Sequence, residues 1–255
     1  MSTTATTPPA TPGSVRAVFA GPIRTLRSPR APDGPATTWR SAILKSRLDD
    51  PVHIGLLGLV GDAQKETKHH GGPTKAVLVY AASHYENHWY DSLGDHATHH
   101  AAELRAMSSE VDASVFGFGA FGENLTVDGL DESRVFLGDV WRVGACLLRI
   151  TEPRGPCATL TRRWMRPLLQ TEVTVTAAAG WYNAVAAPGR VREGDTLELS
   201  ERVQTEWSIA RVFHLLESRM VSRESLAQLI HAPFVNDALR ARLVRRAQTP
   251  GRTRD

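Results

Sequence analysis

The stretch Thr151-Glu152-Pro153-Arg154-Gly155-Pro156-Cys157-Ala158-Thr159-Leu160 connects a predicted strand to a predicted helix. Its two prolines fix φ and bias the residues before them toward extended backbone, so this connection is expected to be rigid. A cysteine follows the second proline at the predicted helix start, and an arginine lies three residues before that cysteine. The segment therefore marks the change from strand to helix and places a thiol and a guanidinium there.

Hydrophobic patterning on both sides of this junction predicts many short strands and few long helices. The predicted strands cover residues 14–19, 39–45, 54–60, 76–80, 123–127, 138–143, 146–150 and 196–199. Short strands separated by turn residues favour an antiparallel sheet closed into a β-barrel. We therefore expect a mainly β fold with helices, of the α+β class.

Helical periodicity occurs in three parts of the chain. Ser83 and Glu86 have the spacing of a capping box and predict a helix just before the histidine-rich segment. A second helix is predicted over residues 168–178. Three short helices are predicted within residues 205–246. Their predicted N-caps are Ser208, Ser222 and Asn236.

These patterns divide the chain into four parts. Residues 1–14 are rich in Ser, Thr and Pro and predict a disordered tail, which lacks the basic start and apolar centre of a secretory signal. Residues 15–204 are predicted to form the barrel domain, and residues 205–246 a three-helix C-terminal domain. Residues 247–255 are predicted to fray.

The composition is typical of a globular protein. The 255 residues are 42% hydrophobic and 22% charged, with a formal net charge of +3. No stretch approaches the roughly 18 apolar residues that span a membrane, and the small net charge gives little indication of nucleic-acid binding. Two cysteines without a CxxC motif do not form a disulfide framework, so we expect a reducing, cytoplasmic setting.

Cys157 has two interpretations. Backbone N–H groups at a helix start stabilise a thiolate, and Arg154 adds positive charge if it points the same way. A thiolate is a nucleophile and a soft metal ligand. Such a cysteine is also commonly a small buried hydrophobe, and the local sequence leaves both interpretations open. Cys146, by contrast, lies mid-strand among apolar residues and is expected in the core.

The segment KHHGGPTK at residues 68–75 is a candidate anion-binding turn. The backbone at Gly71 and Gly72 can approach a ligand closely, and Lys75 supplies charge for a group such as phosphate. The adjacent histidines do not indicate a metal site, because neighbouring side chains rarely aim at one point. An ordinary turn before a strand explains the same residues, so this alternative stays open.

Two further motifs bear on the kind of cofactor. Residues 117–122 match G-x-G-x-x-G, but a strand rather than a helix is predicted to follow, which excludes a nicotinamide or flavin site. Asn124, at the start of that strand, can hydrogen-bond a heterocycle edge or cap a turn. A second histidine cluster has no carboxylate or cysteine at ligand spacing and predicts a solvated segment. Its members are His96, His99 and His100.

Six motifs occur in an order that resembles one family. They are Ser41-Ala42-Ile43-x-Lys45, Gly61-Asp62, His70-Gly71-Gly72-Pro73-x-Lys75-Ala76, Phe121-Gly122-Glu123-Asn124-Leu125, Gly138-Asp139 and Pro153-Arg154-x-Pro156-Cys157. Together they resemble the MOSC domain, named for the C-terminal part of molybdenum cofactor sulfurase, and in particular its bacterial YiiM-like branch. The resemblance extends over residues 15–245 and includes a small three-helix C-terminal domain.

The resemblance implies a barrel-like fold that binds the molybdenum cofactor, a molybdopterin carrying molybdenum. It implies that Cys157 is the catalytic residue and either the molybdenum ligand or a sulfur-binding group. Relatives reduce N-hydroxylated compounds, including N-hydroxylated purines, which implies an oxidoreductase with a detoxifying role. The remaining cofactor-binding candidates are Lys45, His70, Gly71, Gly72, Lys75, Asn124 and Arg154.

The chain has no cysteine cluster for iron–sulfur and no dinucleotide fingerprint, so electrons are expected from a separate reductase. The expected substrate is a small N-hydroxylated molecule, and neither nucleic acid nor a membrane is expected as a partner. Pyridoxal phosphate is not expected, because in the full sulfurase that cofactor belongs to the other half.

Two other functions stay open. One is a sulfur carrier with a persulfide on Cys157, and the other is a non-catalytic module that binds cofactor or a partner. The C-terminal helices are the predicted partner-binding or dimerisation element, so a homodimer is one expected assembly.

Overall fold

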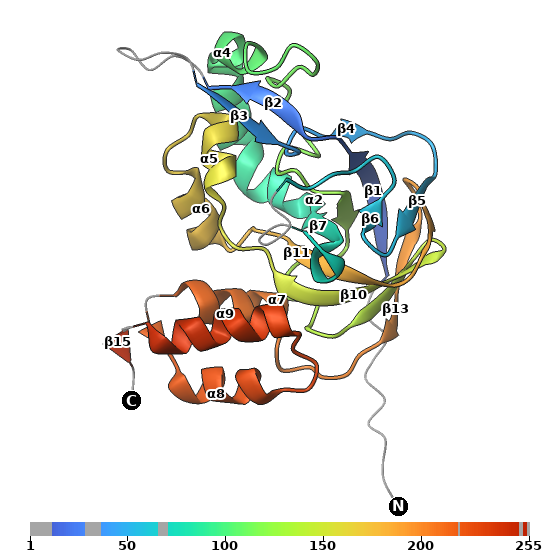
Figure 1. Ribbon diagram of the computed structural model, residues 1–255, viewed down its shortest axis with the longest axis vertical. Helices are drawn as coiled ribbons and strands as arrows, with labels where there is room; N and C mark the ends of the chain where they lie inside the picture. Colours follow the sequence, from blue (N-terminus) through green and yellow to red (C-terminus); the bar gives the residue numbers. More distant parts are fainter. Residues whose placement is uncertain (1–11, 29–36, 66–70, 219, 250–251, 254–255) are drawn as a thin grey trace, which may run out of the picture.

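The computed structural model describes residues 12–28, 37–65, 71–218, 220–249 and 252–253. Its centre is a closed barrel of seven strands in the order β13-β9-β10-β11-β7-β8-β1, in which β1 also pairs with β13 (Figure 1). This arrangement confirms the predicted α+β class with a β-barrel. The barrel strands are β1 (Gly13–Ala20), β7 (Val77–Ala81), β8 (Leu125–Asp128), β9 (Val140–Val143), β10 (Cys146–Pro153), β11 (Trp181–Ala187) and β13 (Thr196–Glu201).

Strand β10 illustrates how the sequence pattern builds the barrel. Cys146, Leu148 and Ile150 are buried, whereas Leu147 and Arg149 between them are more accessible, as the period of two requires. Burying each apolar side chain of this kind contributes about 1.5–3 kcal/mol. Neighbouring barrel strands are antiparallel except for β7 and β8, which are parallel and therefore need a long connection.

Two predicted strands are shorter than expected. Of residues 39–45, only the first part lies in β3 (Thr38–Ser41), which pairs with β2 (Arg24–Arg27). Residues 54–60 do not form one strand but belong to a hairpin of β5 (Val52–Gly55) and β6 (Gly58–Leu59). Gly58 has φ of 121°, a turn conformation that glycine adopts with little strain. The remaining short strands are β4 (Ser46–Arg47) and β12 (Gly189–Val191).

The long connection between β7 and β8 is largely helical. It contains α2 (Ala82–His84), the π-helix η2 (Tyr85–Gly94), α3 (Asp95–His99) and α4 (Ala101–Arg105). The predicted Ser83 capping box is wrong, because the helix begins two residues earlier than that box requires, with Ala81 as N-cap and no side-chain cap. Ser83 is thus already inside the first turn and cannot serve as the cap.

A second apolar core lies beneath this helical connection. Its centre is aromatic, with Tyr80 stacked on Phe121 at 4.7 Å between ring centroids, and Trp164 buried. The sequence predicts helices after the proline junction, and the structure has α5 (Ala158–Trp164) and α6 (Leu169–Thr176) there, both packed into the same core. This packing anchors the helix that begins directly after Cys157.

The C-terminal helices are α7 (Ile209–Glu217), α8 (Arg223–His231) and α9 (Asp237–Gln248). The three predicted N-caps are confirmed, since each side chain accepts a hydrogen bond from the backbone N–H three residues ahead. Figure 1 shows these helices gathered beside β10 at one end of the barrel. Their apolar faces, including Leu239 and Leu243, join the barrel core.

Two short strands lie near the C-terminus, where β14 (Met220–Val221) pairs with β15 (Arg252–Thr253) in parallel. Within the described ranges, no helix has both the length and the apolar character needed to cross a membrane.

Candidate functional site

A cavity of about 180 Å³ opens beside the Pro153–Cys157 loop. Its wall combines the end of β3 with the loop after it, the segment after β6, the helix η1 (Pro73–Lys75), part of β7, the segment just before β8, the junction after β10 and part of β11. Five of the lining residues are basic, and none is acidic. The lining residues are Arg40, Ser41, Ala42, Ile43, Lys45, Ala63, Gln64, Lys65, Lys75, Leu78, Phe121, Gly122, Asn124, Arg154, Cys157, Thr159 and Tyr182.

Arg154 is the most informative residue of the wall. Its side chain is buried, with only 5% of the residue exposed, and its Nε and Nη1 atoms have no hydrogen-bond partner in the described part of the chain. A guanidinium in such a position loses hydration without compensation, at a cost of several kcal/mol. An anionic ligand in the cavity would satisfy these donors, because guanidinium groups bind carboxylate and phosphate oxygens well.

Cys157 lies at the boundary between the loop and α5. Its backbone is extended, with φ of −123° and ψ of 124°, and its Sγ accepts a hydrogen bond from the Thr159 backbone N–H at 3.4 Å. Cys157 thus acts as the N-cap of α5, while its residue is 8% exposed and lines the cavity. A helix N-terminus favours negative charge, so this position suits a thiolate.

Lys45 forms a buried ion pair with Asp62 in the cavity wall. Burial lowers the pKa of Lys45, and the adjacent Asp62 carboxylate opposes this effect. Asn124 donates from Nδ2 to Asp62 Oδ2 at 2.9 Å and accepts from the Leu78 backbone N–H at 3.0 Å. The Asn124 amide therefore orients Asp62, and through it the Lys45 ammonium.

Lys75 and Tyr182 form the side of the cavity next to the C-terminal helices. The Lys75 ammonium lies 5.4 Å from the centre of the Tyr182 ring and 3.5 Å from the buried carboxylate of Glu152. Burial raises the pKa of Tyr182 to about 12, so its hydroxyl stays protonated at neutral pH. The wall thus offers three ammonium groups, two guanidinium groups and a phenol hydroxyl within one small space.

The structure brings five of the predicted site residues to one cavity. They are Lys45, Lys75, Asn124, Arg154 and Cys157. Gly71 and Gly72 precede η1, and Gly72 has φ of 85°, but neither lines the cavity. His70 lies outside the described residues. Their roles in binding a cofactor remain predictions.

Several cavity residues were not predicted as site residues from the sequence. Arg40 lies in a predicted strand in which nothing marked it as a ligand-binding residue, and Tyr182 lies in β11, a strand that was itself missed. Asp62 was visible only as part of a Gly-Asp turn, although the buried pair that it forms with Lys45 is central to the wall.

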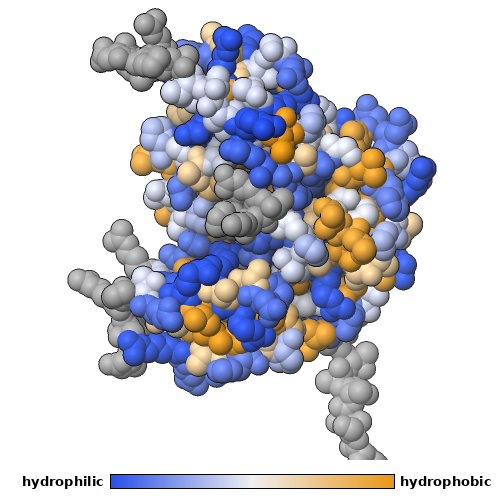
Figure 2. All heavy atoms as spheres, viewed as in Figure 1, coloured by the Kyte–Doolittle hydropathy of each residue, from blue (hydrophilic) through white to orange (hydrophobic). Residues whose placement is uncertain are grey.

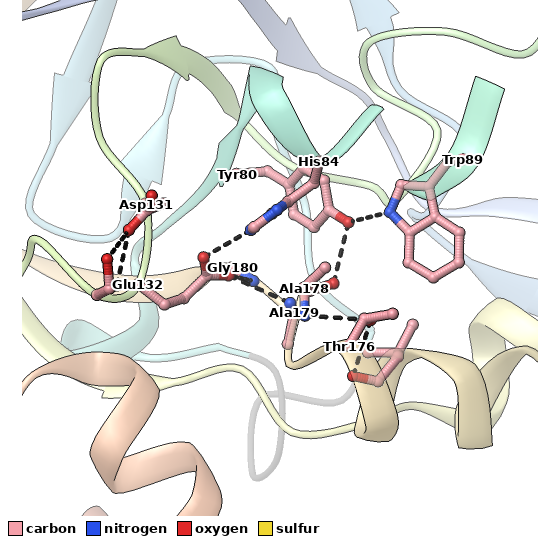
Figure 3. A network of polar contacts seen from close by, with 11 residues as sticks. Tyr80, His84, Trp89, Asp131, Glu132, Thr176, Ala178, Ala179 and Gly180 are labelled. Carbon is pink, nitrogen blue, oxygen red and sulfur yellow. Dashed lines mark hydrogen bonds and ion pairs between the residues drawn. The ribbon is translucent and has the colours of Figure 1, made fainter. Parts of the chain in front are cut away.

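A hydrogen-bond network around Glu132 (Figure 3) includes Gly180, which also binds the backbone of Arg154. Glu132 accepts from the backbone N–H groups of Ala179 and Gly180 at 3.2 and 2.6 Å, and its other oxygen lies 2.6 Å from His84 Nε2. The Gly180 carbonyl in turn accepts from the backbone N–H of Arg154 at 3.0 Å. The position of Arg154 is thereby fixed by buried polar contacts as well as by the prolines.

The histidines of the second cluster, His96, His99 and His100, do not line this cavity. His96 Nε2 lies 2.7 Å from the carbonyl oxygen of Trp164, and His99 Nδ1 lies 2.7 Å from that of Asp95. Across the residues that the structure covers, no three His, Cys, Asp or Glu side chains are grouped to hold a metal ion. The described side chains of these types therefore do not form a complete metal site beside Cys157.

Comparison with known proteins shows which family the chain belongs to. Residues 66–198 match the MOSC domain model. Protein YiiM of Escherichia coli (strain K12) is 34% identical over 197 residues, which are 77% of this chain and 74% of that protein. The uncharacterized protein YflK of Bacillus subtilis (strain 168) is 37% identical over 162 residues, or 64% of each chain.

A protein named "Reductase" from Gibberella moniliformis is 32% identical over 197 residues, but this chain spans only 32% of its length. Among solved structures, YiiM from Geobacillus stearothermophilus has a TM-score of 0.68 at 24% identity, covering 92% of this chain and 99% of that one. YiiM from Escherichia coli has a TM-score of 0.62 at 24% identity, covering 89% and 94%. These likenesses support the same fold. The chain belongs to the MOSC domain family.

Proposed function

We propose that this cavity binds the molybdenum cofactor and that the protein is a reductase of N-hydroxylated compounds. The observation that carries the proposal is the pair of unpartnered donors on buried Arg154, beside Cys157 in a cavity lined by lysines. A site of this kind suits a ligand with both an anionic group and a soft metal. Membership of the MOSC family, whose domains are generally associated with this cofactor, supports the choice.

The residues present fit such a ligand. Lys45, Lys75 and Arg154 would hold the phosphate of the pterin, with the backbone at Gly71 and Gly72 close to η1. Cys157 would bind the metal through its sulfur, as a soft ligand at a helix start. When bound, the molybdenum cofactor supplies two-electron redox chemistry at its metal.

The protein's own groups would bind and orient the substrate and hold protons. Reduction of an N–OH group to an amine and water consumes two electrons and two protons. Lys45 holds a proton on its Nζ beside Asp62, and Tyr182 holds one on its hydroxyl. Such buried donors can hydrogen-bond a hydroxylamine without competition from bulk water.

Electrons would come from a separate reductase. The chain contains two cysteines in all and no dinucleotide-binding motif in the proper strand-to-helix context. The relative named "Reductase" is about three times as long as the part that matches this chain.

The proposal is tested with protein purified from a host that makes the molybdenum cofactor. We expect this protein to contain molybdenum and pterin in comparable amounts. Mass spectrometry measures the metal, and fluorescence of the oxidised extract measures the pterin. The variant Cys157→Ala should lose molybdenum, and it should fail to restore growth of a host sensitive to an N-hydroxylated base. The proposal fails if the wild-type protein holds neither metal nor pterin.

The same sample distinguishes a sulfur carrier. Intact-mass analysis before and after a reductant would show a labile sulfur adduct on Cys157 if that cysteine carries a persulfide. An adduct without molybdenum would favour the sulfur-carrier function, and retention of growth by Cys157→Ala would favour a non-catalytic module.

A further inference from the structure

We infer that helix α9 is part of the functional site, and that Arg242 on this helix is a positioning residue for Lys75 and for the loop that ends at Cys157. The inference depends on the proposed function only for the identity of the ligand in the cavity. The contacts themselves link a C-terminal helix to the barrel, 85 and more residues earlier in the chain.

A buried carboxylate joins the two parts. Glu152, at the end of β10, is fully buried, and its Oε2 accepts a hydrogen bond from Arg242 Nη1 at 2.7 Å. The same oxygen lies 3.5 Å from Lys75 Nζ. A carboxylate in this position is stable as an ion only if cations compensate for its lost hydration. Helix α9 supplies one of these cations and the cavity wall supplies the other.

Sharing this carboxylate affects the charge of the cavity. Because Arg242 holds the closer pairing with Oε2, Glu152 neutralises Lys75 less than it would without Arg242. The cavity therefore keeps more positive potential, which favours an anion. Loss of Arg242 would leave the Glu152 charge to be compensated mainly by groups that face the ligand.

Arg242 also contacts the loop backbone. Its Nη1 donates to the carbonyl oxygen of Pro153 at 3.3 Å, and Nη2 lies 3.6 Å from Glu217 of α7. A Cβ atom at Gly155 would lie only 3.3 Å from Arg242 Nη2, so the loop backbone packs directly against the guanidinium. Cys157 follows two residues later, and the Arg242 side chain thus supports the turn that presents the thiol.

A second connection runs from the start of α9. Asn236, the N-cap, donates from Nδ2 to the carbonyl oxygen of Thr151 at 3.2 Å. The Thr151 hydroxyl lies 2.6 Å from the Thr74 carbonyl and 2.9 Å from the Tyr182 carbonyl, and donates to one of them. Thr74 precedes Lys75 in η1. The link from Asn236 therefore ends at Tyr182, a residue of the cavity wall, and at Thr74, which precedes the wall residue Lys75.

The matched test compares Arg242→Met with Arg245→Met in the full chain. Arg245 lies on the same helix and is exposed, so its replacement removes the same charge without a contact to the loop. Isothermal titration measures the affinity for inorganic phosphate. Alkylation of Cys157 by iodoacetamide, located by peptide mass spectrometry, measures access to the loop, and buried Cys146 serves as an internal reference.

We expect Arg242→Met to weaken phosphate binding roughly three- to tenfold, as the charge balance predicts. We expect Cys157 alkylation to be about threefold faster or more, because a loosened loop opens more often. Arg245→Met should match the wild type in both measurements. Glu152→Gln combined with Arg242→Met should restore phosphate affinity to within about twofold, since no buried charge then competes for Lys75.

Arg242→Lys separates the effect of Arg242 on the charge of the cavity from its support of the loop backbone. It also replaces Arg242→Met as the test if the Met variant does not fold. It should keep the phosphate affinity, because the charge remains, but leave Cys157 alkylation elevated, because lysine lacks the planar fork. Equal behaviour of the Arg242 and Arg245 variants, or no recovery in the double variant, would overturn the inference. If instead wild-type protein from a cofactor-competent host lacks molybdenum while the Arg242 effects persist, only the proposed function fails.

Discussion

The carboxylate of Glu132 accepts a hydrogen bond from the backbone N–H of Gly180 at 2.6 Å, although the two residues are 48 positions apart. Gly180 has φ of 80°, and a Cβ atom there would lie 2.5 Å from the Val79 carbonyl oxygen, so only glycine fits. The Gly180 carbonyl then binds the Arg154 backbone. One buried acid thus sets the turn on which the cavity arginine depends.

Replacing Glu132 by Gln should therefore destabilise the protein by about 1.5–3 kcal/mol, because charge-assisted bonds to two backbone N–H groups are weakened. Urea unfolding followed by tryptophan fluorescence measures the change in free energy. Glu103→Gln, at an exposed position of α4, should change it by no more than about 0.5 kcal/mol. Equal stability of the two variants would contradict the role of Glu132.

The pH dependence of stability should report on Cys146. Burial raises the pKa of Cys146 from 9.0 to about 11. Between these pH values the unfolded chain has already lost the thiol proton while the folded protein keeps it, so stability falls as pH rises. The loss attributable to this thiol is up to roughly 2–3 kcal/mol.

Cys146→Val removes the titrating group while keeping an apolar side chain of similar size. The free energy of unfolding, measured by urea at several pH values, should fall less steeply for this variant between the two pKa values. Below the lower pKa, the curves of the variant and the wild type should run parallel. Parallel curves between the two pKa values as well would show that Cys146 does not contribute.

The two N-caps Asn236 and Ser222 should differ in their effects. Each caps its helix through a side-chain oxygen, and loss of a cap costs about 1 kcal/mol. Asn236 also donates to the Thr151 carbonyl in the barrel, so Asn236→Ala should cost about 0.5–1.5 kcal/mol more than Ser222→Ala. Urea unfolding of both variants checks this difference, and equal losses would mean that the link to Thr151 adds nothing.

The features that follow from local sequence were predicted well. Alternation along β10 gave the strand, and Ser208 gave a true N-cap, because both depend on a few neighbouring residues. The capping box at Ser83 failed because α2 already begins at Ala82. The π-helix η2 that continues it packs Tyr85 and Trp89 into the core, and this tertiary packing overrides the local signal. Strand β11 was missed because its alanines have weak strand propensity.

The candidate site was likewise predicted where the sequence carries a local motif and missed where distant residues meet. The order of motifs placed Cys157, Arg154 and Lys45 near one ligand, and the structure brings them to one cavity. What the sequence did not predict is the compensation of charge. The pairs Lys45–Asp62 and Arg242–Glu152 are 17 and 90 residues apart, and no local pattern specifies such contacts.

Arg154 provides a test in which stability and binding should move in opposite directions. Its buried Nε and Nη1 donors have no partner among the described residues, so the ligand-free protein bears the cost of a buried cation. Arg154→Met should therefore stabilise ligand-free protein by about 1–3 kcal/mol in urea unfolding. The same variant should retain no molybdenum or pterin when purified from a cofactor-competent host, because the anion then lacks its guanidinium.

Arg40→Met is the matched control, since Arg40 lines the same cavity but is exposed. Its removal should leave the stability within about 0.5 kcal/mol, because an exposed cation remains hydrated. A loss of stability in Arg154→Met would mean that the guanidinium is satisfied within the folded chain, and the unpartnered donors would no longer indicate a ligand. A gain of stability with loss of the cofactor would identify Arg154 as a group retained for binding at the expense of the fold.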